Sequence, residues 1–254
     1  MTAGAGATVR TVLDTGGGLV RRQVEVPAGA RHAGSAGPGG ELCFVIEGDG
    51  QLGPVLSGSA AAPGRPVRPG TGVWLPPGTS YSLAAAGPGP LRLDSVLLPA
   101  PAPGADPDGA EPASTEPAST EPASTVLAST VLASTGGPLL ADLAEQPAEI
   151  TGDREFRVLF APGQGCAAAT QFVGEIPPGR APFHSHTYDE VVLILAGEGV
   201  LHVGDEDRPL SPGSCLHLAP GTPHCLENTG QDTLRVLGVF HPGGSPAAKK
   251  PARG

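Results

Sequence analysis

The chain contains one pattern twice, and this duplication limits its fold more than any other feature of the sequence. A glutamate, six mostly apolar residues and a Gly-x-Gly turn run from 41 to 50 and again from 190 to 199. A second matched segment runs from Gly70 to Tyr81 and from Gly213 to His224, and both copies contain Pro-Gly-Thr. Matched segments in the same order indicate that one small fold occurs twice in the chain.

Short apolar runs separated by turn residues predict an all-β chain. The 254 residues include 39 glycines and 30 prolines, many of which fall at short intervals between the apolar runs. That spacing is typical of short strands joined by tight turns. Each half of the chain has about 100 residues, which is enough for one small domain. We therefore expect two antiparallel β-barrel domains of the jelly-roll type.

A repeat of a different kind separates the two halves. Residues 111–135 are five pentapeptides, of which three read EPAST and two read VLAST. Small polar residues and proline bury too little apolar surface to offset the entropy of the chain, so we expect a disordered linker over 99–138. The predicted organisation is an N-terminal domain (1–98), this linker, a C-terminal domain (139–246) and a basic tail (247–254).

The charge and the cysteines argue against several classes of protein. The net charge is −10, and Lys and Arg cluster only in the short tail, so no nucleic-acid partner is expected. No run reaches the roughly 20 apolar residues that cross a membrane. The first ten residues lack the apolar segment of a secretory signal, and the four cysteines have no C-x-x-C spacing. A cytoplasmic protein with free thiols is expected.

Two motifs in the second half resemble those of the cupin superfamily. The first is a glycine, His-x-His, a glutamate and a glycine, and it reads Gly179-RAPF-His184-S-His186-TYD-Glu190-VVLILA-Gly197. The second is a glycine, Pro-x-Gly, a histidine and an asparagine, and it reads Gly213-SCLHL-APGTP-His224-CLE-Asn228. The first spacer is one residue shorter than usual and Ala219 stands at the usual proline, but no ligand position is lost. With the duplication, the resemblance implies a bicupin.

The resemblance implies that His184, His186, Glu190 and His224 bind one metal ion, and strand geometry agrees. Residues i and i+2 of a strand point to the same face, so the two nearby histidines present their imidazoles together. Three imidazoles and a carboxylate suit a divalent transition metal: Fe, Mn, Ni, Cu or Zn. Burying four such groups without a metal would be costly, which favours a metal over a cluster held only by hydrogen bonds.

The first half of the chain matches the fold of the resemblance but not its site. Only Glu41 stands at a ligand position, because His32 has no second histidine two residues away and Tyr81 replaces the histidine of the second motif. We therefore expect a degenerate cupin domain in this half and one metal ion per chain.

Strand alternation also predicts the walls around the metal. If Glu190 points inward, Val192 and Ile194 do so too, and Leu226 joins them from two residues beyond His224. The pocket is then apolar around the metal, as ligand pockets generally are.

Four other residues are weaker candidates, and a fifth has no expected function. Tyr188 lies beside the first motif and is a candidate gate, and His217 is a candidate neighbour of the metal ligands. Arg157 and Gln171 lie on predicted neighbouring strands, from which they could contact a polar substrate. His202 is expected to be an ordinary strand residue.

Two classes of function stay open. Four protein ligands leave positions open on a five- or six-coordinate metal, where a small substrate or O2 could be polarised. Among two-domain cupins the resemblance allows oxygenases, decarboxylases, isomerases and hydrolases, so the favoured hypothesis is a metal-dependent enzyme that acts on a small molecule. The alternative is a non-catalytic cupin that binds or senses a small ligand. Fold alone does not choose between them, and the resemblance also allows a homodimer.

Overall fold

The computed structural model describes residues 6–54, 64–101, 137–247 and 250–251. These residues are mostly in strands, which confirms the predicted all-β class, and the helical structure among them is one 3-10 turn, η1 (Leu143–Glu145). Most of the predicted linker, 102–136, lies outside the described residues. In the described part of the chain, no helix has the length and apolar character needed to cross a membrane.

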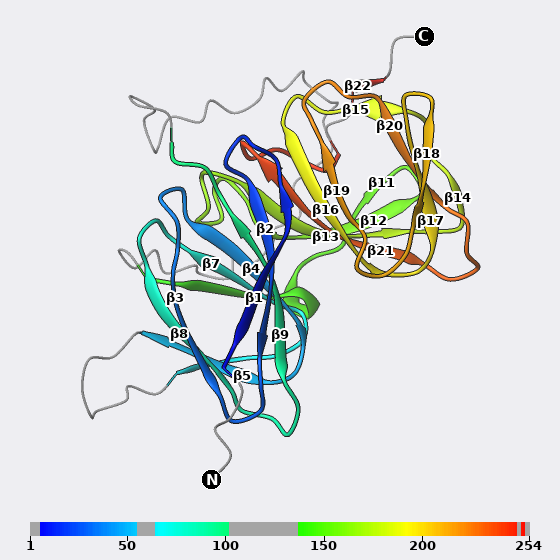
Figure 1. Ribbon diagram of the computed structural model, residues 1–254. Coiled ribbons are helices and arrows are strands. Elements are labelled where there is room, and N and C mark those ends of the chain that lie inside the picture. The colour runs from blue at the N-terminus through cyan, green and yellow to red at the C-terminus, as the bar shows by residue number, and fades with distance from the viewer. Residues whose placement is uncertain (1–5, 55–63, 102–136, 248–249, 252–254) are drawn as a thin grey trace, which may run out of the picture.

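The N-terminal unit consists of a large and a small antiparallel sheet (Figure 1). The N-terminal large sheet contains, in spatial order, β1 (Thr8–Asp14), β2 (Val20–Val26), β9 (Leu91–Leu97), β4 (Glu41–Glu47), β7 (Thr71–Leu75) and β10 (Leu139–Asp142). The N-terminal small sheet contains β3 (Arg31–Ser35), β8 (Ser80–Ala85), β5 (Gly50–Pro54) and β6 (Arg65–Val67). The two sheets bury one apolar cluster between them, with Val45 and Val73 on one side and Leu52 and Leu83 on the other.

The C-terminal unit repeats this arrangement. The C-terminal large sheet contains β11 (Glu149–Thr151), β12 (Arg154–Phe160), β13 (Thr170–Ile176), β21 (Leu234–His241), β16 (Asp189–Ala196) and β19 (Cys215–Leu218). The C-terminal small sheet contains β18 (Glu206–Leu210), β17 (Gly199–Val203), β20 (His224–Asn228), β15 (His184–Ser185) and β22 (Lys250–Pro251), and β14 (Gly179–Arg180) also pairs with β20. Each unit is thus a jelly roll of two facing sheets, as predicted, and not one continuously hydrogen-bonded barrel.

The two large sheets pack against each other back to back. Leu42 and Phe44 of β4 lie in one buried cluster with Val191 and Leu193 of β16. The residues between them point to the inside of their own units, so both faces of these strands are covered. This double burial explains why the two matched segments are apolar at nearly every position. The molecule is a stack of four layers, with the small sheets on the outside.

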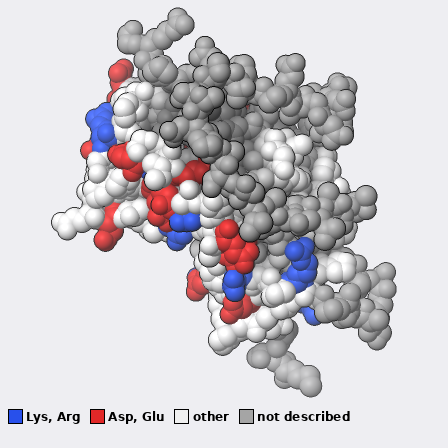
Figure 2. All heavy atoms as spheres, turned by 180° about the vertical axis from the view of Figure 1, so that it is seen from behind, with Lys and Arg blue, Asp and Glu red and all other residues white. Residues whose placement is uncertain are grey.

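Polar groups also cross the contact between the large sheets. Arg21 and Asp94 form a fully buried ion pair with Nε–Oδ1 and Nη2–Oδ2 distances of 2.8 and 2.9 Å, and Nη2 of Arg21 also lies 3.3 Å from the carbonyl oxygen of Leu237 in the other unit. Nε2 of Gln171 donates to the carbonyl of Cys43 at 3.5 Å. On the outer surface, acidic and basic side chains are interspersed over the described part of the face that Figure 2 shows.

One strand joins the units in an unexpected way. β10 lies at the start of the second half of the sequence, but it pairs antiparallel with β7 of the N-terminal large sheet, where Leu139 is opposite Trp74. Residues 139–142 therefore extend the first unit, whereas the domain ranges taken from the sequence stay a prediction.

Candidate metal centre

Two of the four candidate ligands face each other across a strand pair. His184 of β15 is the register partner of His224 of β20, and their ring centroids are 4.4 Å apart. Each Nδ1–H donates to a carbonyl two residues earlier in the chain: that of Pro182 at 3.3 Å and that of Thr222 at 2.9 Å. Because a carbonyl can only accept, these bonds assign the hydrogen to Nδ1 and direct the Nε2 lone pair inward.

The other two candidate ligands complete a compact set of donor atoms. Oε2 of Glu190 lies 3.6 Å from Nε2 of His186 and 3.6 Å from Nε2 of His224. The ligand atoms of the three histidines all lie within 4.8 Å of one another, and this is the one such group among the described residues. Donors on a metal with bonds of about 2.1 Å are roughly 3 to 4.2 Å apart. The set therefore fits a transition-metal ion after small shifts.

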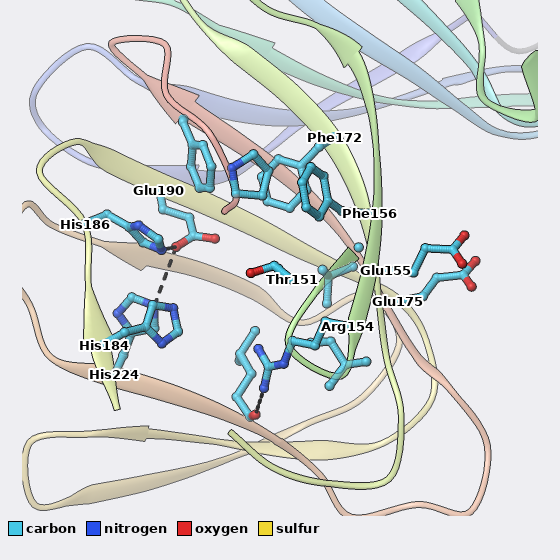
Figure 3. A pocket seen from close by; sticks show the side chains of 16 residues that line it. Thr151, Arg154, Glu155, Phe156, Phe172, Glu175, His184, His186, Glu190 and His224 are labelled. Carbon is cyan, nitrogen blue, oxygen red and sulfur yellow. Dashed lines mark hydrogen bonds and ion pairs between the residues drawn. The ribbon is translucent and has the colours of Figure 1, made fainter. Parts of the chain in front are cut away.

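A small cavity lies against the four residues (Figure 3). Its volume is about 60 Å³, and most of its wall is apolar, with Phe156, Phe172, Leu226 and Val236 among the lining residues. The predicted apolar pocket is therefore present. Leu226 lies in its wall, whereas Val192 and Ile194 pack in the apolar cluster between the two sheets of the unit.

Arg154 places a cation at the cavity. No motif of the sequence indicates this residue as part of the site. Its side chain is 11% exposed, and Nη2 donates to the carbonyl of Leu226 at 2.8 Å. Burial lowers the pKa of this guanidinium, while Asp153 and the Glu190 carboxylate raise it. Figure 3 shows Arg154 on the opposite side of the cavity from the three histidines.

Tyr188 and the segment after β21 cover one side of the site. The Tyr188 ring stacks on His186 with centroids 5.0 Å apart, and its hydroxyl donates to the carbonyl of Ser245 at 2.8 Å. Pro246, the next residue, is buried and lines the cavity. Burial raises the pKa of Tyr188, so its hydroxyl stays protonated and can keep this bond. Tyr188 therefore ties the segment with Ser245 and Pro246 to the site, and its role as a gate stays a prediction.

Four other residues named in the sequence analysis lie away from the cavity. Arg157 donates outside it to the Gln146 carbonyl at 2.9 Å and to Glu155 at 2.6 Å. Gln171 faces the other unit. His217 contacts Asp189 at 2.7 Å on the side of the sheet away from Glu190. His202 contacts Asp207 at 2.5 Å and Glu227 at 2.7 Å, so it is a buried member of an ionic group and more than an ordinary strand residue.

The equivalent place in the N-terminal unit is filled by a different set of side chains. Gly34 is the register partner of Tyr81, as His184 is of His224. A Cβ atom on Gly34 would lie only 2.6 Å from Cζ of Tyr81, so the tyrosine ring occupies the space of the missing histidine pair.

Glu41 in this unit is neutralised by an arginine. Its carboxylate is fully buried and lies 2.7 Å from Nη2 of Arg22. It also accepts a short hydrogen bond from Ser95, and the single hydrogen of the Tyr81 hydroxyl lies between its two oxygens, each 3.3 Å from the hydroxyl oxygen. A permanent cation with protein donors thus stands where the C-terminal unit has three imidazoles, and one metal ion per chain stays a prediction.

Residues 172–240 match the family model described as the cupin domain. The chain is also similar to the oxalate-binding protein of Thermotoga maritima, with 37% identity over 68 residues, which is 26% of this chain and 56% of that protein. Auxin-binding protein 1 of Arabidopsis thaliana is 27% identical over 73 residues, 25% of this chain and 37% of that protein. The chain thus spans from about a third to about half of these relatives.

Several solved structures match nearly the whole chain. A Bacillus subtilis oxalate decarboxylase superposes with a TM-score of 0.67 at 14% identity, over 96% of this chain and 74% of that one. Procruciferin, an 11S globulin from Brassica napus, gives 0.65 at 15% identity over 92% and 78%. The protein Ylba from E. coli gives 0.63 at 13% identity over 92% and 81%. Likeness at such low identity establishes the fold alone.

Proposed function

We propose that this chain, a bicupin of the cupin superfamily, is a metal-dependent enzyme that acts on a small molecule at the motif of its C-terminal unit. The observation that carries the proposal is the convergence of His184, His186, Glu190 and His224 on one buried point beside a cavity. We propose these four residues as the ligands of one divalent transition metal per chain.

The protein groups around this point suit catalysis. A bound metal would act there as a Lewis acid toward a substrate oxygen. The carbonyls that accept from Nδ1 of His184 and His224 fix the rings, and Tyr188 packs against His186. The apolar walls limit access of water, which strengthens electrostatic interactions in the cavity. The relatives include an oxalate-binding protein and oxalate decarboxylases, which supports a small substrate.

A non-catalytic cupin that binds a small ligand is the second candidate. The printed names of the relatives include binding proteins as well as enzymes, and the same pocket would serve both. The two candidates differ in one measurable property, since only the enzyme turns over a substrate.

Metal content of the purified protein tests the site. We expect one equivalent of metal per chain by elemental mass spectrometry, and His184→Ala or His186→Ala each to lose most of it. His202→Ala is the matched control, because its ring nitrogens contact Asp207 and Glu227; it should keep the metal. An equal loss of metal in His202→Ala would show that the site has been assigned to the wrong residues. A second equivalent of metal per chain would contradict a degenerate N-terminal unit.

Turnover separates the two candidates for function. The metal-loaded protein is incubated with small organic acids, and oxygen uptake, CO2 release and loss of substrate are followed. Turnover that disappears in His186→Ala supports the enzyme. Saturable binding without turnover would support the non-catalytic binding protein.

A further inference from the structure

The strongest unused feature of the molecule is the cavity face of Arg154. Nε of this guanidinium is buried and has no hydrogen-bond partner among the described residues, and the nearby Asp153 carboxylate, at 3.9 Å, is too distant for a hydrogen bond. A buried charged donor that makes no hydrogen bond costs more free energy than an ordinary hydrogen bond contributes. Arginine also presents a planar fork that matches a carboxylate.

The other charged residues of the cavity wall do not neutralise Arg154. Glu155 lies 2.6 Å from Arg157 and Glu175 lies 3.4 Å from Arg235, and both carboxylates point away from the cavity in Figure 3. Glu190 belongs to the proposed metal ligands. With a divalent ion bound, the charges facing the cavity sum to a positive value, which favours an anionic ligand.

The size of the cavity limits that anion. A volume of about 60 Å³ holds only a few water molecules. Apolar walls with a single guanidinium also provide few donors for the three or four oxygens of a phosphate group. A carboxylate needs two donors, and the rest of a short acid fits the space between Arg154 and the histidines.

We propose that Arg154 is the anion-binding residue of this pocket and that the substrate is a short carboxylic acid, with a carboxylate on Arg154 and its other end toward His184, His186 and His224. This assignment rests on the proposed function for the metal. It makes Arg154 a substrate-binding residue that determines specificity for charge.

Calorimetric titration of the manganese-loaded protein with oxalate and with oxamide, its uncharged isostere, tests the assignment. We expect oxalate to bind more tightly than oxamide, and Arg154→Gln to weaken oxalate about tenfold or more while its metal content and oxamide affinity stay as in the wild type. Arg157→Gln is the matched control, because that arginine lies outside the cavity; its oxalate affinity should not change.

Two results would overturn the assignment: equal binding of oxalate and oxamide by the wild type, or unchanged oxalate affinity in Arg154→Gln. If that variant does not fold, Arg154→Lys replaces it, since it keeps the charge but lacks the planar fork; affinity at least about threefold weaker is expected, and an unchanged value would overturn the assignment.

A wild type that takes up none of manganese, iron, nickel, copper and zinc would contradict the proposed function but not the assignment of Arg154. The melting temperature of the metal-free protein with and without oxalate then tests the assignment of Arg154. Stabilisation by oxalate of the wild type and not of the Arg154 variant supports the assignment, and equal shifts overturn it.

Discussion

Glu41 and Glu190 begin matched strands in the two units, and each is buried among groups that can offset its charge. Glu190 faces imidazoles, whereas Glu41 faces the permanent cation of Arg22 and the hydroxyls of Ser95 and Tyr81. Burial raises the pKa of the Tyr81 hydroxyl, so it remains a donor to the carboxylate at neutral pH. The N-terminal unit thus keeps the glutamate of the site as part of its core.

Replacing Arg22 by methionine should destabilise the protein strongly. Glu41 is 0% exposed and Arg22 is 21% exposed, so the substitution leaves a buried carboxylate without its cation. Removal of one partner from a buried pair costs about 3–5 kcal/mol; discounted for the exposure of Arg22, we expect about 2 kcal/mol or more from denaturant unfolding. Arg92→Met is the control, because its pairs with Glu25 and Glu47 are exposed and such pairs contribute little to stability.

The sequence predicts the four proposed ligands but not Arg154, for a physical reason. The ligands occur in motifs whose residue types and spacing are set by the site. Arg154 and Arg157 both lie on β12, and the alternation that decides which one faces inward is interrupted by a bulge between Val158 and Phe160. A one-residue shift of register moves every side chain to the other face, so sequence alone could not select the arginine.

At the scale of elements, strands were predictable from apolar runs, but the partners of short strands were not. β10 has four half-buried residues and no pattern that names its sheet. Its pairing with β7 depends on contacts far away in the sequence. The segment after β21 supplies Pro246 to the cavity. Its place there could not be predicted either, because it has neither apolar periodicity nor regular structure.

Deletion of 111–135 should leave the fold intact. Leu97 and Leu139 lie at the same end of the N-terminal large sheet, with β4 and β7 between them, so the connection spans three strand spacings, about 14 Å. The 16 residues that would remain between them can reach about 50 Å. We expect a melting temperature within about 5 °C of the wild type, a change of roughly 1–2 kcal/mol at most.

A larger fall would show that the deleted segment packs on the rest of the molecule. The control is deletion of 139–142, which removes β10 from the edge of β7 and should lower the melting temperature further than the linker deletion does.

At the scale of the whole molecule, the two units share a core and should unfold together. A Cβ atom on Gly72 of β7 would lie 3.1 Å from both Oε1 of Gln171 and Cε2 of Phe160 in the other unit. Gly72→Val should therefore overpack this contact, at about 1–3 kcal/mol, and lower the melting temperature by several degrees. Gly53→Val is the control, because the nearest atom there is 3.7 Å away.

Two signals measure this cooperativity. Trp74 is the single tryptophan of the chain and lies in the cluster between the large sheets, and calorimetry reports all residues. Coincident transitions in the wild type and in Gly72→Val are expected. Separate transitions would show that each unit folds by itself.

The place of β10 also sets an order of events during synthesis. β7 is buried along its whole length, and its open edge is covered only when residues 139–142 pair with it. The ribosome adds about 5–20 residues per second, so the 42 residues from Leu97 to Leu139 take roughly 2–8 s. During that interval the nascent N-terminal sheet has an unpaired apolar edge, the kind of surface that chaperones recognise and that pairs with other chains. The length of the connecting segment therefore sets the time before β10 can pair with β7, and a shorter segment would allow this pairing sooner.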